Sequence, residues 1–169
     1  MSMNEKRFNI LARNFIFGVE DSLVSTVGVI SGVAVAGMPK MTILVTGMIL
    51  IFVEAFSMGA GSFISEHSAQ EYAKKKNNDR QTTSASLVMF VSYFIAGLIP
   101  IFPYLIMDIE LAFWVSISAS VLGLGLLGFI NAKIYNTKVF HHAFEMLLIG
   151  GVAIGVGTLV GKLADMLIK

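Results

Sequence analysis

The sequence predicts an all-α, polytopic membrane protein with five transmembrane helices. Of its 169 residues, 56% are hydrophobic and only 14% are charged, which is typical of integral membrane proteins and not of soluble domains. The hydrophobic residues form five runs, and each reaches the roughly 20 residues that an α-helix needs to cross a bilayer. Short links join the runs, so we expect residues 1–169 to form a single transmembrane helical domain.

The runs give the expected bounds of the helices: Asn14–Ala36, Met41–Ser65, Ala85–Met107, Leu111–Ala132 and Ala143–Met166. The basic N-terminal stretch lacks a small-residue cleavage motif, and its apolar run continues far beyond a signal-peptide core, so we expect it to be retained. Pro100 and Pro103 should kink or end the third helix. The third and fourth runs hold no charged side chain, and we expect them to serve as scaffold.

The basic residues predict the orientation of the chain. If the N-terminus lies in the cytosol, most of them fall on the cytosolic side, as the positive-inside rule requires. These residues are Lys6, Arg7, Arg13, Lys74, Lys75, Lys76, Arg80, Lys133 and Lys138. Only Lys40, Lys162 and Lys169 fall outside or near that end. We therefore expect a cytosolic N-terminus, an external C-terminus and a short basic cytosolic link over about residues 66–84.

Composition argues against several functions. The net charge of +1 gives no basis for nucleic-acid binding, and the lack of cysteine excludes disulfides and thiolate metal sites. All histidines lie near the ends of the runs, so a serine within the membrane has no base beside it and a hydrolase is not supported. We predict a protein that is not an enzyme and has no resident cofactor.

Carboxylates inside the apolar runs are the strongest functional signal. Asp21 lies well inside the first run and Glu54 inside the second, and Met58 follows Glu54 by one turn on the same helical face. A charged residue at the bilayer centre costs about 2.5–3.5 kcal/mol on insertion scales, so it usually faces a partner or a water-filled path. An oxygen ligand beside a thioether suits a borderline transition metal better than Mg²⁺ or Ca²⁺. If the first two helices are neighbours, Asp21 and Met58 would lie at one depth.

Glu20 and the start of the polar link supply further candidate metal ligands. Glu20 adjoins Asp21, but adjacent helical residues point about 100° apart, so both need not face the same way. Glu66, His67 and Glu71 could bind metal at an inner mouth of the path, or they form a solvated helix end.

The start of the fifth run holds the last candidate, Glu145. It follows His141 by four residues and His142 by three, spacings that can hold a metal on one helical face. The alternative is a polar first turn in which the helix dipole favours Glu145.

Small residues recur at intervals of four in two of the runs. Gly28 and Gly32 form such a ridge in the first run, and the fifth run contains the pairs Gly151/Gly155 and Gly157/Gly161. These ridges allow helices to approach closely. They serve packing within the chain, or two copies meet along the Gly28/Gly32 ridge and line a pore together as a homodimer.

Two segments resemble the vacuolar iron transporter family. They are GVEDSLVSTVGVISGVA in the first run and SMGAGSFISEHSAQE at the end of the second. Members of that family have a D-G/S-L-x-x-x-x-G first helix, an S-M-x-x-G second helix, five spans and a basic link after the second span. The resemblance implies a homodimer that exchanges cytosolic Fe²⁺, often Mn²⁺, for protons. It also implies a path between the two first helices at the dimer interface, lined by Asp21 and Met58.

The chain departs from the plant members of that family in two respects. They have a long, Glu-rich metal-binding domain between the second and third spans, where this chain has only a short link. They also have a second-helix carboxylate at the position of Leu50, and Glu54 is the candidate to take its place one turn along.

The predicted function is a transporter that exports or sequesters Fe²⁺ or Mn²⁺ from the cytosol in exchange for protons. Its partners would be divalent metal ions, protons, the lipid bilayer and a second copy of the chain. Its membrane would be the plasma (inner) membrane in a prokaryote and the vacuolar membrane in a eukaryote. The alternative is a non-transporting scaffold or a small-molecule exporter, which explains the glycines but leaves Asp21 and Glu54 without a role.

Overall fold

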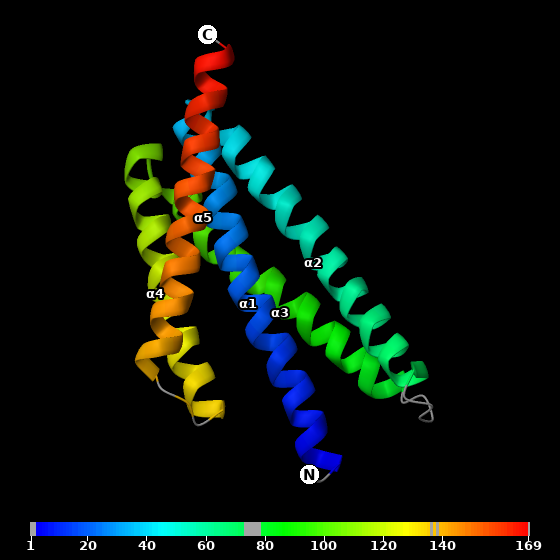
Figure 1. The fold of residues 1–169 in the computed structure, drawn as a ribbon. Helices are drawn as coiled ribbons and strands as arrows, with labels where there is room; N and C mark the ends of the chain where they lie inside the picture. Colours follow the sequence, from blue (N-terminus) through cyan, green and yellow to red (C-terminus); the bar gives the residue numbers. More distant parts are fainter. Residues whose placement is uncertain (1–2, 73–78, 136, 138, 169) are drawn as a thin grey trace.

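Five long α-helices make up the described part of the chain, as the sequence predicts. The computed structural model describes residues 3–72, 79–135, 137 and 139–168. The helices are α1 (Met3–Val35), α2 (Lys40–Tyr72), α3 (Asp79–Ile106), α4 (Ile109–Tyr135) and α5 (Val139–Ile168). All five are long and apolar enough to cross a membrane. The two ends of the chain lie at opposite ends of the bundle (Figure 1), as an odd number of spans requires.

The helices extend beyond the predicted spans, mainly at the end of the bundle near the N-terminus. Both α1 and α2 have 33 residues, about 50 Å of helix against a hydrocarbon core of roughly 30 Å. The predicted link over residues 66–84 is therefore mostly helical, because α2 continues to Tyr72 and α3 begins at Asp79. The apolar pattern stops where a helix leaves the membrane, whereas the backbone stays helical. Lys74, Lys75 and Lys76 lie outside the described residues.

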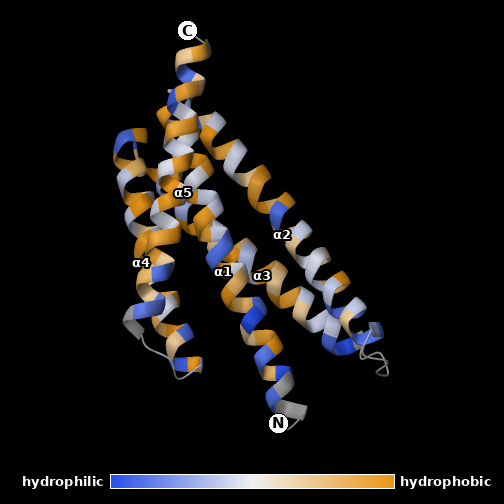
Figure 2. Ribbon diagram, in the orientation of Figure 1, coloured by the Kyte–Doolittle hydropathy of each residue, from blue (hydrophilic) through white to orange (hydrophobic). Residues whose placement is uncertain are grey.

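Helix α1 is the centre of the bundle and contacts each of the other four helices. Helix α2 packs on α1 and α3, while α5 packs on α1 and α4, so α1 runs between α2 and α5 (Figure 1). Figure 2 shows hydrophobic residues along most of each helix and hydrophilic residues gathered toward the helix ends nearest the N-terminus. Large apolar side chains such as Phe56, Leu122 and Leu159 are exposed, as expected for surfaces that face lipid.

The glycine ridge of α1 packs against α5 of the same chain. A Cβ atom at Gly32 would lie 2.5 Å from the carbonyl oxygen of Gly157, and one at Gly28 would lie 3.1 Å from that of Ala153. A methyl group on Gly157 or Gly161 would overlap the carbonyl oxygens of Gly28 and Gly32. Of the two alternatives for the Gly28/Gly32 ridge, the structure therefore shows packing within the chain and not a contact with a second copy.

A tight turn joins α1 to α2 and fixes how the two helices pack. Gly37 has a positive φ of 71°, which glycine adopts without steric cost. The amide of Met38 donates to the carbonyl of Val33 at 3.4 Å, and that of Gly37 donates to Ala34 at 3.0 Å. This is the Schellman pattern that ends a helix at a left-handed residue. The chain then reverses directly into α2.

Helix α3 continues through the two prolines that were expected to kink or end it. Pro100 and Pro103 both lie inside the helix, which ends at Ile106. The Ser116 hydroxyl of α4 donates to the carbonyl of Pro100 at 2.7 Å. The helix thus stops only one turn after the second proline, near the predicted end of the span.

Candidate metal site

Asp21 on α1 and Glu54 on α2 lie at the same depth in the bundle. Each is about 14 residues, or roughly 21 Å, from the turn that joins the two helices. The two helices that carry these carboxylates contact each other. Both side chains are partly exposed in the single chain. The structure therefore pairs two of the predicted ligands across adjacent helices.

Helix α3 holds this part of α1 in place through Tyr93, which the structure buries completely. Ser22 donates a hydrogen bond to the carbonyl oxygen of Tyr93 at 2.6 Å. The hydroxyl groups of Ser25 and Tyr93 are 2.7 Å apart. Because Ser22 is the neighbour of Asp21 in the chain, these bonds fix the rotation of α1 about its axis and hence the direction of Asp21.

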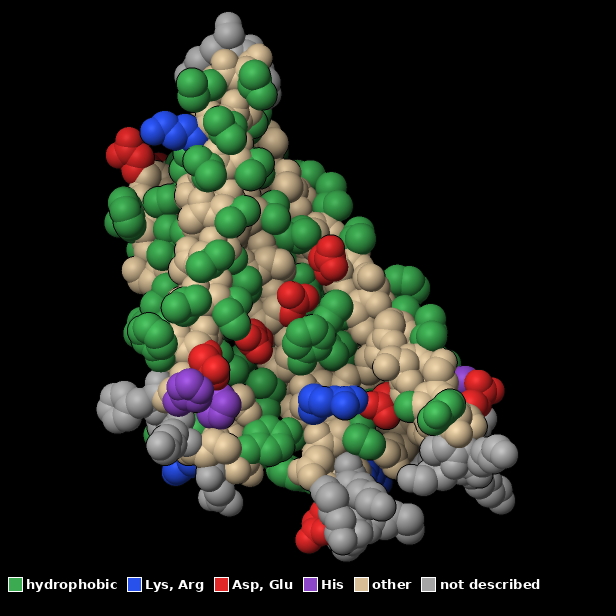
Figure 3. Space-filling model, in the orientation of Figure 1, with side chains coloured by type: hydrophobic (Ala, Val, Ile, Leu, Met, Phe, Trp, Pro, Cys, Tyr) green, Lys and Arg blue, Asp and Glu red, His purple; other side chains and the backbone are tan. Residues whose placement is uncertain are grey.

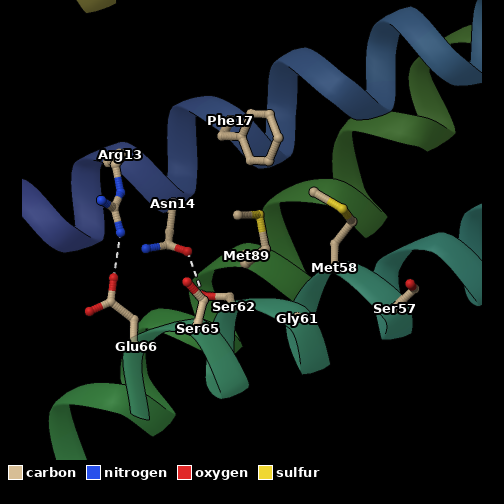
Figure 4. A pocket seen from close by; sticks show the side chains of 10 residues that line it. All are labelled: Arg13, Asn14, Phe17, Ser57, Met58, Gly61, Ser62, Ser65, Glu66 and Met89. Atoms are coloured by element: carbon tan, nitrogen blue, oxygen red, sulfur yellow. Dashed lines mark hydrogen bonds and ion pairs between the residues drawn. The ribbon is translucent and has the colours of Figure 1, made fainter. Parts of the chain in front are cut away.

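Met58 lies one turn nearer the N-terminal end of the bundle than the carboxylate pair. It lines a cavity of about 630 Å³ between α1, α2 and α3, together with Asn14, Phe17 and Met89. Figure 4 shows the side chains that surround this space. Asp21 is not among its lining residues. We expected Asp21 and Met58 to lie at one depth, but the structure places them about one helical turn apart. Asp21 is level with Glu54, and Met58 is level with Phe17.

An ion pair between α1 and α2 borders the end of this cavity nearest the N-terminus. Arg13 pairs with Glu66, and one turn deeper the hydroxyl of Ser62 donates to Oδ1 of Asn14 at 2.6 Å (Figure 4). The Glu66 side chain is only 12% exposed, whereas that of Arg13 is 66% exposed. Glu66 therefore lines the cavity with its carboxylate paired to the Arg13 guanidinium group.

The other two candidates of the link, His67 and Glu71, do not join Glu66. They form a pair of their own along α2, with His67 Nε2 3.5 Å from a carboxylate oxygen of Glu71. The His67 ring also stacks on Phe63. Glu66 lines the cavity, while the pair lies outside its lining.

Glu145 is held by both neighbouring histidines on α5. His142 Nδ1 is 3.0 Å and His141 Nε2 is 3.3 Å from its two carboxylate oxygens. Glu20 and Glu145 line one shallow cavity between α1 and α5. Glu20 thus faces α5, while Asp21 faces α2.

The acidic residues form a row across one face of the molecule. Figure 3 shows acidic side chains that follow one another diagonally from α2 over α1 to α5, where histidines lie beside the last of them. Within the described residues, however, no three acidic or histidine side chains come together in a way that could hold a metal ion. In the part of one chain that the structure describes, acidic and histidine side chains thus follow one another in a row without forming a group of three around one point.

Several residues of this site lie outside the sequence motifs. From the sequence alone, Arg13 contributes only to the predicted orientation of the chain, and Asn14 only marks the start of a span. Met89 and Tyr93 lie in a helix that we expect to serve as scaffold. Their roles depend on contacts between helices, such as the one from Asn14 to Ser62. Only the polarity of Asn14 at the edge of an apolar run could have drawn attention to it.

Comparison with known families agrees with the resemblance seen in the motifs. A model of the VIT family matches residues 12–83 and 73–162, two overlapping stretches that together include most of every helix. The two matched stretches overlap at the link between α2 and α3. No curated protein matches the chain.

Proposed function

The chain belongs to the VIT family, and we propose that it moves Fe²⁺ or Mn²⁺ out of the cytosol in exchange for protons. Membership of this family, together with five helices able to span a membrane, makes it an integral multi-pass membrane protein and indicates metal-ion transport in general. The observation that supports the finer proposal is that Asp21 and Glu54 share one depth on adjacent helices within the apolar spans.

Two carboxylates at one depth on contacting helices explain how metal and proton exchange would be coupled. When both are ionised they repel each other, and either a proton on one of them or a cation between them relieves the repulsion. A divalent cation binds the ionised groups, so its arrival releases protons. If the pair faces the two sides of the membrane in turn, a metal ion leaves the cytosol as protons enter it.

The cavity beside Met58 would admit the metal from the cytosolic side. It lies on the N-terminal side of the carboxylate pair, the side that the positive-inside rule assigns to the cytosol. Glu66 at its end would bind a cation in place of Arg13, with which it pairs in the structure. The Met58 thioether favours Fe²⁺ over Mg²⁺ or Ca²⁺, which prefer oxygen ligands. A metal ion would pass from the cavity to Asp21 and Glu54, one turn deeper.

A homodimer would complete the site. The acidic row lies partly exposed on one face (Figure 3), and a charged side chain is costly in contact with lipid. A second copy related by a two-fold axis would bring its own row opposite the first, so that pairs of ligands become a full coordination shell. We therefore place the dimer contact on the face that carries Asp21.

Metal flux into vesicles under an imposed pH gradient tests this function. Purified protein in proteoliposomes should accumulate Fe²⁺ or Mn²⁺ when the gradient drives protons the other way, and the protons should move in step with the metal. Asp21→Asn keeps the volume of the side chain but cannot ionise, so it should abolish flux while the protein stays folded and dimeric. Wild-type vesicles that move neither metal, or an Asp21→Asn variant with normal flux, would refute the proposal and favour the scaffold or exporter alternative.

A further inference from the structure

A second thioether enters the cavity that contains Met58. Met89 of α3 lines the same cavity, and Figure 4 shows both methionine side chains reaching from α2 and α3 toward α1. Met89 is only 5% exposed. Its Sδ atom lies 3.2 Å from the position that a Cβ atom would take at Gly18. The missing side chain at Gly18 therefore leaves room for the sulfur of Met89 against α1.

The surroundings of this pair differ from those of a methionine that only fills space. Met107, for example, packs against an apolar cluster with residues such as Ile101 and Tyr104. Met58 and Met89 instead border an unfilled volume of about 630 Å³ whose other lining includes Asn14 and Glu66. A thioether that borders open polar space is available as a ligand, whereas one in a packed core is not.

We propose that Met58 and Met89 together form a soft-metal subsite on the cytosolic side of Asp21 and Glu54. Two thioethers are weak ligands for Mg²⁺ and Ca²⁺, stronger for Fe²⁺, and strongest for soft monovalent ions such as Cu⁺ and Ag⁺. The subsite would hold transition metals and reject the abundant hard cations before either reaches the carboxylates. Its part in transport rests on the function proposed above, but its binding of metal does not.

Silver binding tests the subsite directly. Ag⁺ added to the purified full-length protein in detergent should bind tightly in a calorimeter. Even outer-shell substitutions at metal sites commonly cost 10–100-fold in affinity, so loss of a ligand in Met58→Leu or Met89→Leu should weaken Ag⁺ binding by roughly tenfold or more. The double variant should be little weaker than either single variant, because both remove the same site. Met107→Leu, at a methionine that packs against an apolar cluster, should bind Ag⁺ as the wild type does.

Transport provides the second readout. In proteoliposomes, Met89→Leu should raise the Fe²⁺ concentration for half-maximal flux and weaken discrimination against Mg²⁺, while the maximal rate is largely kept. A Met89→Leu protein that binds Ag⁺ as tightly as the Met107→Leu control would overturn the subsite. If the wild type moves no Fe²⁺ at all, the proposed function fails, and the Ag⁺ comparison alone still decides whether the two thioethers act together.

Discussion

The depth of each side chain sets what it can do in this bundle. Asp21 and Glu54 share a level because both lie about 14 residues from the turn between α1 and α2. Met58 follows Glu54 by one helical turn, so it lies farther from the loop that joins α1 to α2. It lines the cavity together with Phe17. Metal binding would thus proceed in two steps, first beside sulfur and then between carboxylates.

Glu54→Gln tests whether the second carboxylate is a ligand. Gln has nearly the same shape but carries no charge, so the variant should fold normally and bind Fe²⁺ at least roughly tenfold more weakly, as expected for loss of a group from the metal site. Fe²⁺-dependent flux in proteoliposomes measures the effect. Glu110→Gln is the control, because Glu110 lies in the first turn of α4, outside the acidic row. A Glu54→Gln protein with the same apparent affinity as the Glu110→Gln control would show that Glu54 is not a ligand.

The ion pair of Arg13 with Glu66 should couple α1 to α2 only weakly. Arg13 is 66% exposed, so water and salt screen the pair, and exposed pairs typically contribute about 0.2–1 kcal/mol. A double-mutant cycle with Arg13→Gln and Glu66→Gln, followed by thermal unfolding in detergent, measures the coupling free energy. It should fall within that range and shrink in high salt. Strictly additive effects of the two substitutions would mean that the pair does not join the helices.

At the scale of the helices, contact between α1 and α5 depends on glycines that have no room for a side chain. Gly157 and Gly161 lie directly against the carbonyl oxygens of Gly28 and Gly32. Gly151 and Gly155, on the same helix, have no heavy atom within 4 Å of an added Cβ. Helix α5 thus carries one ridge that is filled by α1 and a second that α1 does not touch.

Alanine substitutions on α5 should separate these two ridges. Gly157→Ala or Gly161→Ala would force α5 away from α1 and should lower the free energy of unfolding by about 1–3 kcal/mol, the usual cost of overpacking. Gly151→Ala and Gly155→Ala add a methyl group in open space and should change it by no more than about 0.5 kcal/mol. Thermal unfolding in detergent checks both pairs. Equal effects on the two ridges would contradict the close packing of α1 on α5.

The sequence predicted the helices well because length and apolarity alone decide whether a helix crosses a bilayer. The sequence predicted the ends of the helices less well. Helix α2, for example, continues to Tyr72, beyond the end of its apolar pattern. A ridge such as Gly28/Gly32 indicates that another helix packs closely there, but the sequence does not show which helix it is. In the structure it is α5.

The candidate site was predicted in part. Asp21 and Glu54 stood out because charge is rare and costly within an apolar run. Met89 did not, because an uncharged residue in an apolar helix gives no local sign of bordering a cavity. The pairing of Arg13 with Glu66 depends on how α1 and α2 pack, which no local pattern contains.

For the whole molecule, the distribution of charge distinguishes one face from the rest. Most of the exposed membrane surface is apolar, with side chains such as Trp114 and Leu122 on α4. The face formed by α2, α1 and α5 instead carries the acidic row (Figure 3). Contact between charged side chains and lipid is energetically costly. We therefore expect a second copy of the chain to bind to this face.

Cross-linking of single-cysteine variants locates that contact, and the absence of native cysteine makes the experiment clean. Phe17 is 50% exposed and lies one turn from Asp21 on α1, whereas Leu122 is 74% exposed on α4. A short bifunctional thiol reagent added to native membranes should convert Phe17→Cys into a covalent dimer and leave Leu122→Cys monomeric. Because the proposed two-fold axis passes between the two copies of α1, the two Phe17 positions approach each other while the two Leu122 positions stay on opposite outer surfaces. Dimers formed through Leu122→Cys and not through Phe17→Cys would place the contact on the lipid face of α4 and leave the acidic row uncovered.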